Sequence, residues 1–356
     1  MIELKTCPEC GVPDYVTREH LWLDNGDIVQ SRDEGHRVVF FESENIDPLF
    51  RKIEQIIGVP VDPIVITAVR REVRNYVSLL IPDEVKGLIR NKVVDVATIA
   101  QSLIDVAKMV GHGCQKIVGY RYEKDENDYY TVTVREPFSL PMQCGTLLGT
   151  TEAVAGVENT VTYEKLSEDT YKITTFPCPH PEEMKERLRL RRYRRRPGDR
   201  KQERCATCGG PRALGGYQWH LDRGVILNKA SGRRMIITGP NELDVVFKEL
   251  EQELGETIPN VVVEAQRRFA ADGFYSLGDI EEVEDFGNRL ALRGLGNLRD
   301  LQISGKGLRM RLENAVLHLM VVGMLQGVFD ASRGVESRVE WELSEQGTLE
   351  VEIFSM

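Results

Sequence analysis

The sequence predicts an α+β protein made of two homologous modules, each a Cys-x-x-Cys knuckle and β-hairpin followed by helices and an antiparallel sheet. Three observations predict it: an internal repeat, a change from helical spacing to alternation within each copy, and a Cys-x-x-Cys-Gly motif at the start of each copy. The chain of 356 residues, with 41% hydrophobic and 29% charged residues, is long enough for two globular domains.

The repeat aligns residue 7 onward with residue 205 onward, at an offset near 197, over roughly seventy residues. The matched pairs include Cys7-Pro-Glu-Cys10-Gly11 with Cys205-Ala-Thr-Cys208-Gly209, Trp22 with Trp219, and Ala68-Val69-Arg70-Arg71 with Ala265-Gln266-Arg267-Arg268. Chance does not preserve a register over that length. We therefore expect a first repeat at 1–180, a basic linker at 181–204 and a second repeat at 205–356.

The first part of each copy combines a hairpin with helices. In copy one, Asn25-Gly26 supplies the positive φ angles of a tight turn, and residues 37–41 form a further strand. A helix begins at Asp47-Pro48 and ends at Gly58, because Asp caps a helix, Pro suits its first turn and Gly terminates it. The longest predicted helix is Val94–Val110, where apolar residues recur at helical spacing.

The second part of each copy alternates with a period of two. In copy one the predicted strands are 116–122, 129–134, 160–165 and 171–176, with a helix at 144–154. Copy two repeats this ending at 309–312, 315–329, 338–342 and 349–354. Residues 274–296 of copy two correspond to residues 77–113 of copy one, and this part of copy two is fourteen residues shorter. We therefore expect copy two to lack most of the helix that corresponds to Val94–Val110.

Composition narrows the class of protein. The net charge of −10 argues against nucleic acid as a partner of the whole chain. The N-terminus lacks the apolar run of a signal peptide, and no apolar stretch approaches the roughly 20 residues of a membrane helix, which predicts a cytoplasmic protein. Four of the seven cysteines form two Cys-x-x-Cys pairs, which in a reducing compartment indicates metal or redox chemistry.

The end of copy one carries an ordered set of motifs. A strand ends near Phe138, Pro141-Met-Gln-Cys144 follows, then a helix with Gly149 and a loop with Gly156, then the strand Thr160-Val-Thr-Tyr-Glu164. This order resembles the 4-vinyl-reductase domain family, over roughly residues 94–176 and more faintly over 298–354. The resemblance implies an α+β fold shared with Golgi transport tethering subunits and aromatic-sensing domains of bacterial activators. It also implies an enclosed pocket for a hydrophobic small molecule.

One departure from that family concerns metal. Metal-binding members carry cysteines just after the position of Glu164 and in the last strand, where this chain has Lys165, Leu166 and Tyr171-Lys172-Ile173. We therefore do not expect the family's own metal site here.

The knuckles themselves predict a structural zinc site. Each offers two thiolates, whereas tetrahedral zinc requires four ligands. Three arrangements are open: Cys7, Cys10, Cys205 and Cys208 together; one pair with Cys178 and His180; or matching pairs across a homodimer. We favour the first, because a duplication often retains a pseudo-twofold axis that brings equivalent elements together. A redox dithiol or unliganded cysteines are the alternatives.

A hydrophobic ligand is expected in copy one, with walls from the predicted helices and strands. The predicted ligand-binding residues are Leu103, Tyr130, Val132, Cys144, Leu147 and Leu148. In copy two, bulky residues are expected to fill the corresponding space: Leu317, Leu319, Met320, Met324 and Leu325.

Other polar residues receive less specific interpretations. His112 is expected at a helix end and partly exposed, and Arg70-Arg71 and Arg267-Arg268 on solvated helix faces, with a carboxylate clamp as the alternative. Between Lys185 and Arg204, eleven basic residues oppose three acidic ones. This segment is expected to lie against the acidic repeats, and contact with nucleic acid or an anionic surface is the alternative.

Together these features predict a soluble small-molecule-binding protein, a sensor or carrier, with a structural zinc site. The sequence shows no phosphate-binding glycine loop, nucleophile elbow or Ser-His-Asp context, so no catalytic residue is assigned. The alternatives are an enzyme or accessory factor of a reductive or anaerobic aromatic or tetrapyrrole pathway, and a nucleic-acid-associated regulator acting through the basic linker.

Overall fold

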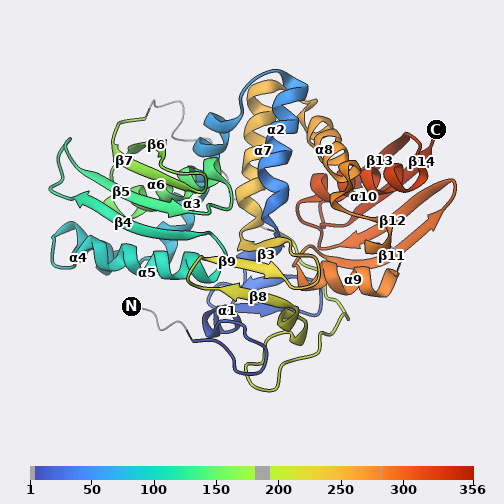
Figure 1. Ribbon diagram of the computed structural model, residues 1–356, viewed down its shortest axis with the longest axis horizontal. Coiled ribbons are helices and arrows are strands. Elements are labelled where there is room, and N and C mark those ends of the chain that lie inside the picture. The colour runs from blue at the N-terminus through green and yellow to red at the C-terminus, as the bar shows by residue number, and fades with distance from the viewer. Residues whose placement is uncertain (1–4, 181–192, 281) are drawn as a thin grey trace.

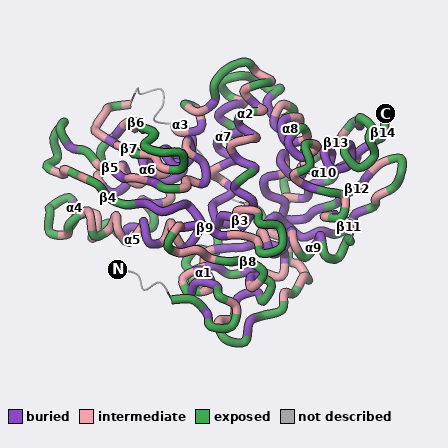
Figure 2. Tube along the Cα trace, viewed as in Figure 1, coloured by how far each residue is buried: buried purple, intermediate pink, exposed green. Residues whose placement is uncertain are grey.

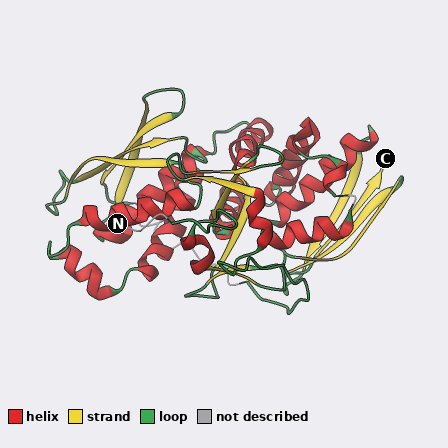
Figure 3. Ribbon diagram, turned by 60° about the horizontal axis from the view of Figure 1, so that its bottom comes forward, coloured by secondary structure: helices red, strands yellow, loops and turns green. Residues whose placement is uncertain are grey.

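The computed structural model describes residues 5–180, 193–280 and 282–356, and it confirms the predicted α+β class. A six-stranded sheet occupies the centre, and two four-stranded antiparallel sheets lie at opposite ends of the molecule with helices between them (Figures 1 and 3). None of the helices in the described part of the chain is both long and apolar enough to cross a membrane.

The first half begins with a short helix and a hairpin, continues with helices and ends in a sheet with one helix inserted. Its elements are α1 (Asp14–Glu19), β1 (His20–Trp22), β2 (Ile28–Gln30), β3 (Arg37–Glu42), α2 (Ile46–Ile57), α3 (Asp62–Leu80), α4 (Asp83–Arg90), α5 (Val96–Met109), β4 (Cys114–Arg121), β5 (Tyr129–Arg135), α6 (Leu140–Ala155), β6 (Asn159–Lys165) and β7 (Thr170–Pro177).

The second half follows a similar order of elements. They are β8 (Tyr217–His220), β9 (Val225–Asn228), β10 (Arg234–Thr238), α7 (Pro240–Leu254), α8 (Ile258–Phe269), α9 (Val283–Leu292), β11 (Asn297–Ser304), β12 (Gly307–Glu313), α10 (His318–Arg333), β13 (Ser337–Leu343) and β14 (Leu349–Ser355). The expectation that this half lacks most of the long helix is wrong. Helix α9 keeps 10 residues against 14 in α5, and a 3-10 turn, Leu277–Asp279, stands between α8 and α9 where the first half has α4.

The central sheet is shared by the two halves. Its order is β1-β2-β3-β10-β9-β8, and the antiparallel pairing of β3 with β10 places Phe40 opposite Ile237 and Phe41 opposite Ile236. Every residue of β3 is buried, because alternate side chains point to opposite faces and both faces are covered. Val38 and Phe40 belong to one core, near the knuckles, whereas Val39 and Phe41 belong to another among the helices.

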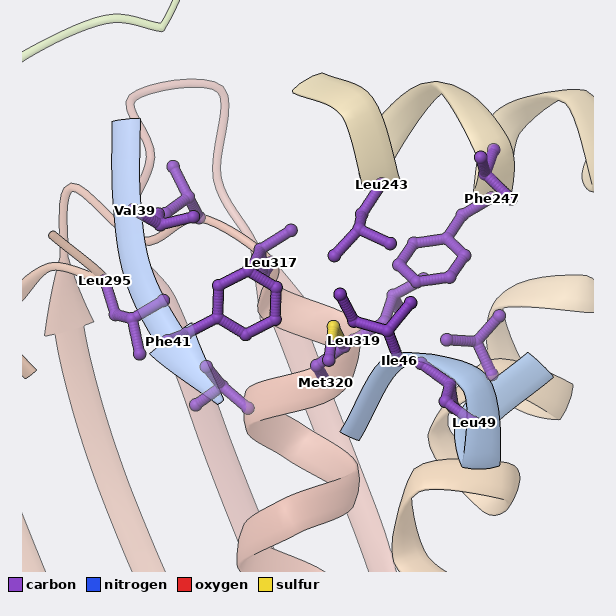
Figure 4. Packing of buried hydrophobic residues seen from close by; sticks show 14 of the residues in the cluster. Val39, Phe41, Ile46, Leu49, Leu243, Phe247, Leu295, Leu317, Leu319 and Met320 are labelled. Carbon is purple, nitrogen blue, oxygen red and sulfur yellow. The ribbon is translucent and has the colours of Figure 1, made fainter. Parts of the chain in front are cut away.

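The helical core also mixes the halves. Helix α2 of the first half packs against α8 of the second, and α7 of the second packs against α3 of the first. Figure 2 shows the continuous buried region that results, and Figure 4 shows Ile46 and Leu49 of α2 in one cluster with Leu243 and Phe247 of α7. The boundaries 1–180 and 205–356 stay a prediction, but the largest buried cluster contains residues of both segments.

Reciprocal polar contacts tie each hairpin to the opposite half. Trp22 Nε1 donates to the carbonyl oxygen of Leu292 at 2.9 Å, and Trp219 Nε1 donates to that of Met109 at 3.1 Å. Both carbonyls lie at the C-terminal end of a helix, α9 or α5, where backbone acceptors lack partners within the helix. The repeated tryptophans therefore stabilise the contact between the two halves.

Two buried arginines also form hydrogen bonds from one half to the other. Arg37 donates to the carbonyl oxygens of Gly294 and Asn314 at 2.9 Å, and Arg234 donates to those of Gly111 and Pro137 at 3.2 and 3.1 Å. Arg37 also forms an ion pair with buried Asp27 at 2.7 Å. Each arginine thus connects the central sheet to the outer part of the other half.

Glycines allow two helix pairs to approach closely. A Cβ at Gly149 of α6 would lie 2.4 Å from the carbonyl oxygen of Arg70 in α3, and one at Gly327 of α10 would lie 2.3 Å from that of Arg267 in α8. Both distances are far below van der Waals contact, and the opposing atoms are backbone. The α3–α6 and α8–α10 contacts therefore require glycine at these positions.

We predict that Gly149→Ala lowers the free energy of unfolding by about 1–3 kcal/mol, because the added methyl group forces the two helices apart. Gly87→Ala is the matched control: Gly87 lies in α4 with no atom within 4 Å of the added Cβ. There the substitution should raise stability by about 0.5–1 kcal/mol, since alanine loses less backbone entropy in a helix. Chemical denaturation measures both, and equal effects would contradict the close-packing argument.

Candidate metal centre and ligand cavities

The structure brings together the four cysteines of the two knuckles. Their Sγ atoms all lie within 4.8 Å of one another, with Cys7 and Cys205 at 3.8 Å and Cys10 and Cys208 at 3.6 Å. This is the first of the three arrangements that the sequence left open. His180, named in the second, instead lies 2.8 Å from Glu152 through Nε2.

Each knuckle is a tight loop that ends in a glycine. Gly11 and Gly209 have φ angles of 75° and 72°, a left-handed conformation that favours glycine and turns the chain back after the second cysteine. In both loops the glycine amide donates to the first cysteine's carbonyl, at 2.8 Å in Gly11 and 3.0 Å in Gly209. The loops are also joined directly, since the Thr207 hydroxyl donates to Glu9 Oε2 at 2.8 Å.

The sulfur spacing fits tetrahedral zinc. A Zn–S bond of about 2.3 Å places sulfurs at the corners of a tetrahedron about 3.8 Å apart. The measured 3.6 and 3.8 Å agree with that value and are much longer than the roughly 2.0 Å of a disulfide. The four thiols therefore form a possible metal site, in which two of the sulfur pairs have the separation that tetrahedral zinc requires.

Backbone amides favour the thiolate form in part of this cluster. Burial by itself raises the pKa of Cys7, but hydrogen bonds from the backbone of Cys10 and Glu9 outweigh it and lower that pKa to about 7. Burial raises the pKa of Cys10 and of Cys208, while backbone hydrogen bonds from Val12 and Gly210 act in the opposite sense. A cation is the partner that would keep all four sulfurs deprotonated.

A cavity of about 120 Å³ lies in the first half between α5, α6, β4 and β5. Its apolar walls include Ala100, Leu103 and Ala107 of α5 and Leu147 and Val154 of α6. The space corresponds to that of a single aromatic ring, because a cavity of about 150 Å³ holds benzene.

The predicted ligand-binding residues divide into two groups. Leu103, Tyr130 and Leu147 line the cavity. Cys144 and Val132 lie instead in a small core cluster that also contains Val134 and Ile173, and Leu148 is buried without lining the cavity. The difference arises from the faces of α6. The face toward the cavity carries residues 143, 147, 150 and 154, whereas residues 144 and 148 lie on the adjacent face.

Polar groups missed in the sequence also line this cavity. Gln143 is 1% exposed, and its Oε1 has no hydrogen-bond partner within the described ranges. The buried hydroxyl of Tyr122 likewise has none there. Such atoms are uncommon in folded proteins, so they indicate places where a ligand or water would bind.

His112 is buried, which corrects the expectation of a partly exposed residue at a helix end. It lines the cavity, packs against Phe138 at 4.5 Å between ring centroids, and its Nε2 lies 3.1 Å from the carbonyl oxygen of Ile237. Because a carbonyl only accepts, Nε2 carries the proton of the neutral ring. Burial lowers the pKa of His112 to about 4, against the backbone hydrogen bond to Ile237.

A larger cavity, about 320 Å³, lies in the second half. Leu317, Met320 and Met324 line it. Its described lining takes residues from β3, α9 and α10 but none from β11 or β12, whereas β4 and β5 line the first-half cavity, so it is not the equivalent space and the expectation that bulky residues fill that space stays a prediction. Leu319 and Leu325 are buried in the surrounding core. Residues of α9 line the side opposite α10.

The arginines that recur in both copies form ion pairs with carboxylates of the protein itself. Arg70 lies 3.1 Å from the buried Glu152 of α6, and Arg71 lies 2.5 Å from Glu249 of α7. Arg267 lies 2.7 Å from Asp330 of α10, while Arg268 is exposed beside Glu264. The solvated-face expectation is therefore wrong except for Arg268, because the other three arginines hold adjacent helices together.

The described part of the basic segment lies against the protein, whereas residues 185–192 fall outside the described ranges. Arg195 lies 3.7 Å from Asp27, Arg196 lies 3.6 Å from Glu313, and the Tyr193 hydroxyl donates to Asp244 at 2.7 Å. These contacts follow the expected association of the linker with acidic residues of both halves.

We predict a loss of stability in acid that His112 causes. The pKa of His112 is about 4 in the folded state and near 6.5 in the unfolded state. The contribution of this neutral histidine to the free energy of unfolding is therefore complete above about pH 6.5 and is lost as the pH falls toward 4. The loss should amount to roughly 2–3 kcal/mol. Urea denaturation between pH 7 and 4 measures it.

His112→Gln should reduce that acid dependence. Burial also lowers the pKa of His36 to about 4, so His36 contributes a second loss in the same range. The His36→Gln variant and the double variant separate the two contributions. An unchanged acid dependence in His112→Gln would contradict the assignment.

Comparison with known proteins gives no family. No family model matches the chain, and no curated protein matches it. Solved structures that are similar in part are H-NOX proteins. They include a K. algicida H-NOX mutant in the unliganded Fe(II) form (12% identity, TM-score 0.27, 37% of this chain and 78% of that one) and a T. tengcongensis H-NOX mutant (14% identity, TM-score 0.24, 33% and 74%). At these TM-scores the likeness carries no argument about this chain.

Proposed function

We propose that the protein binds a small hydrophobic molecule, as a sensor or carrier, and that one structural zinc ion joins its two halves. The ligand occupies the first-half cavity, and the zinc is held by Cys7, Cys10, Cys205 and Cys208. The proposal includes a duplicated module of the 4-vinyl-reductase type, supported by the motifs around Cys144 and by the similar order of elements in the two halves.

The observation that carries the ligand-binding function is the chemistry of the first-half cavity. Its lining is mainly apolar, and it contains two buried polar atoms without partners within the described residues, Gln143 Oε1 and the Tyr122 hydroxyl. Small-molecule sites combine apolar walls with a few polar groups that orient the ligand. The hydroxyls of Thr146 and Thr151, which also line it, already donate to backbone carbonyls at 2.9 Å.

The charges around the cavity favour a neutral ligand. Arg121 and Asp128 both line it, but they pair with each other at 2.9 Å. Gln143 and Tyr122 are uncharged, and the depressed pKa keeps His112 neutral near pH 7. A neutral aromatic molecule with one hydrogen-bonding group therefore matches both the size and the polarity of the site.

Zinc has a structural role in this proposal because the four ligands fill its tetrahedron. A catalytic zinc keeps one position for water or substrate, whereas a four-cysteine site leaves none. The ion would join residue 7 to residue 205, two points far apart in the chain but adjacent in the structure. It would thus stabilise the contact between the halves.

We predict one zinc per chain in protein purified without chelator, measured by elemental analysis and native mass spectrometry. Cys208→Ser should lose the zinc and unfold at a lower temperature, because three ligands hold the ion more weakly. Cys178→Ser, outside the cluster, should retain both zinc and stability. Zinc-free wild-type protein with an unchanged melting temperature would refute the metal assignment.

We predict that phenol, used as a neutral single-ring probe with one hydrogen-bonding group, binds the first-half cavity and that Ala107→Phe abolishes this binding by filling the space. Ser102→Phe is the matched control, since it adds the same ring to the same helix at a position outside the lining. Ligand-detected NMR and thermal shift measure binding. Equal phenol binding by wild type and a folded Ala107→Phe variant would contradict the proposed site.

A further inference from the structure

The larger cavity lies where the two halves meet. Its walls come from β3 and the following turn in the first half, and from the β9–β10 hairpin, α9 and α10 in the second. The apolar side includes Leu290, Leu317, Met320 and Met324. Figure 4 shows the ring of Phe41 from β3 beside Leu317, within this apolar side. At about 320 Å³ the cavity reaches the size range of small-molecule sites, about 300–1,000 Å³.

One side of this cavity is a buried polar cluster. Glu42, which is 2% exposed, lies 2.5 Å from Arg293 Nη2 through Oε1. The hydroxyl of Tyr275 donates to Glu42 Oε2 at 3.4 Å, and Asn45 Nδ2 lies 3.5 Å from that hydroxyl. All four residues line the cavity. Burying a charged pair in this way is costly unless its remaining hydrogen-bonding capacity is satisfied.

That capacity is not satisfied within the described residues. Asn45 is 3% exposed, and its Oδ1 has no hydrogen-bond partner there; the same is true of the buried Nε of Arg293. A ligand group that accepts from Arg293 and bonds the Asn45 amide would satisfy both. The amide can be turned over to present Nδ2 instead, because its oxygen and nitrogen are nearly equivalent in shape.

The balance of charge favours an anionic group. The cavity is lined by three guanidinium groups and two carboxylates, namely Arg233, Arg289, Arg293, Glu42 and Asp279. Glu42 already pairs with Arg293, and Asp279 Oδ2 accepts from the amide and hydroxyl of Ser276 at 2.8 and 2.9 Å. Both carboxylates are therefore engaged. Arg233 donates to the carbonyl of Phe274 and lies over the rings of Phe274 and Tyr275, and Arg289 donates to the carbonyl of Asp279. These partners are uncharged, so one net positive charge is left for a carboxylate, for which guanidinium is a well-matched partner.

We propose that this cavity is a second ligand site that binds a small amphipathic carboxylate, with its apolar body against α10 and its carboxylate toward Arg293 and Arg233. The site does not rest on the function proposed above, because its lining shares no residue with the first-half cavity. It also uses residues 41–45, which lie outside the part of the chain that resembles the 4-vinyl-reductase family.

The test compares 2-naphthoate with 2-naphthamide, a neutral molecule of nearly the same shape, by calorimetric titration of the full chain. We expect one naphthoate per chain, bound at least about tenfold more tightly than the amide, the difference that one charge-assisted hydrogen bond produces. Arg233→Gln should reduce this preference severalfold. Arg268→Gln, which removes an exposed arginine outside the cavity, should not.

Cavity-filling variants locate the site. Met324→Trp should weaken naphthoate binding at least about tenfold, because the indole occupies the apolar side. Ser231→Trp, at an exposed position that lines the same cavity, provides a second block if the first variant fails to fold. Ala107→Phe, in the other cavity, should leave naphthoate binding unchanged.

Three results would overturn the proposal: equal affinity for acid and amide, no naphthoate binding to folded wild-type protein, or loss of binding in Ala107→Phe but not in the two blocking variants. The last result would place the acid in the first-half cavity. Failure of phenol to bind the first-half cavity would refute the earlier proposal and leave this one intact, because the two cavities share no lining residue.

Discussion

The pairing of β3 with β10 is the interaction on which the rest of the structure depends. Phe40 and Ile237, which occupy equivalent positions at an offset of 197, lie directly opposite each other, so the two strands are related by a local twofold axis. Both faces of the pair are buried, one toward the knuckles and the other toward the helices. Separating the halves would expose both cores at once and would leave the facing edges of β3 and β10 without partners.

This axis explains why equivalent residues meet or exchange partners. At the axis, Cys7 faces Cys205 and Cys10 faces Cys208, which turns two incomplete ligand pairs into one possible tetrahedral site. Away from it, Trp22 and Trp219 each reach a helix end of the opposite half. The cavities differ because the lining differs: Glu42 and Arg293 bring a buried charged pair to the second, whereas the buried polar groups without partners in the first, Gln143 and Tyr122, are neutral.

Local rules predicted the local structure. The turn at Asn25-Gly26, the helix end at Gly58 and the strands around Tyr130 fall close to their expected places, because turn chemistry and periodicity act within a few residues. In the turn, however, Gly26 has the expected positive φ and Asn25 does not. The cysteine cluster was also foreseen, from the register of the two knuckles. The buried states of His112 and Arg70 were not, because their partners, Ile237 and Glu152, are more than eighty residues away. The large cavity was missed for the same reason, since Glu42 and Arg293 come from different halves.

Native-state hydrogen exchange tests most directly whether the halves form one cooperative unit around β3 and β10. The amides of residues 39–41 and 236–238 should be among the slowest in the chain and should exchange with a single free energy of opening, the same in both strands. As denaturant is added, the free energies of opening of the core amides in α6 and α10 should approach the value for β3 and β10 at the same denaturant concentration. Exchange of one half at a distinctly lower free energy, with the other half still protected, would show that the halves unfold independently and would contradict this account.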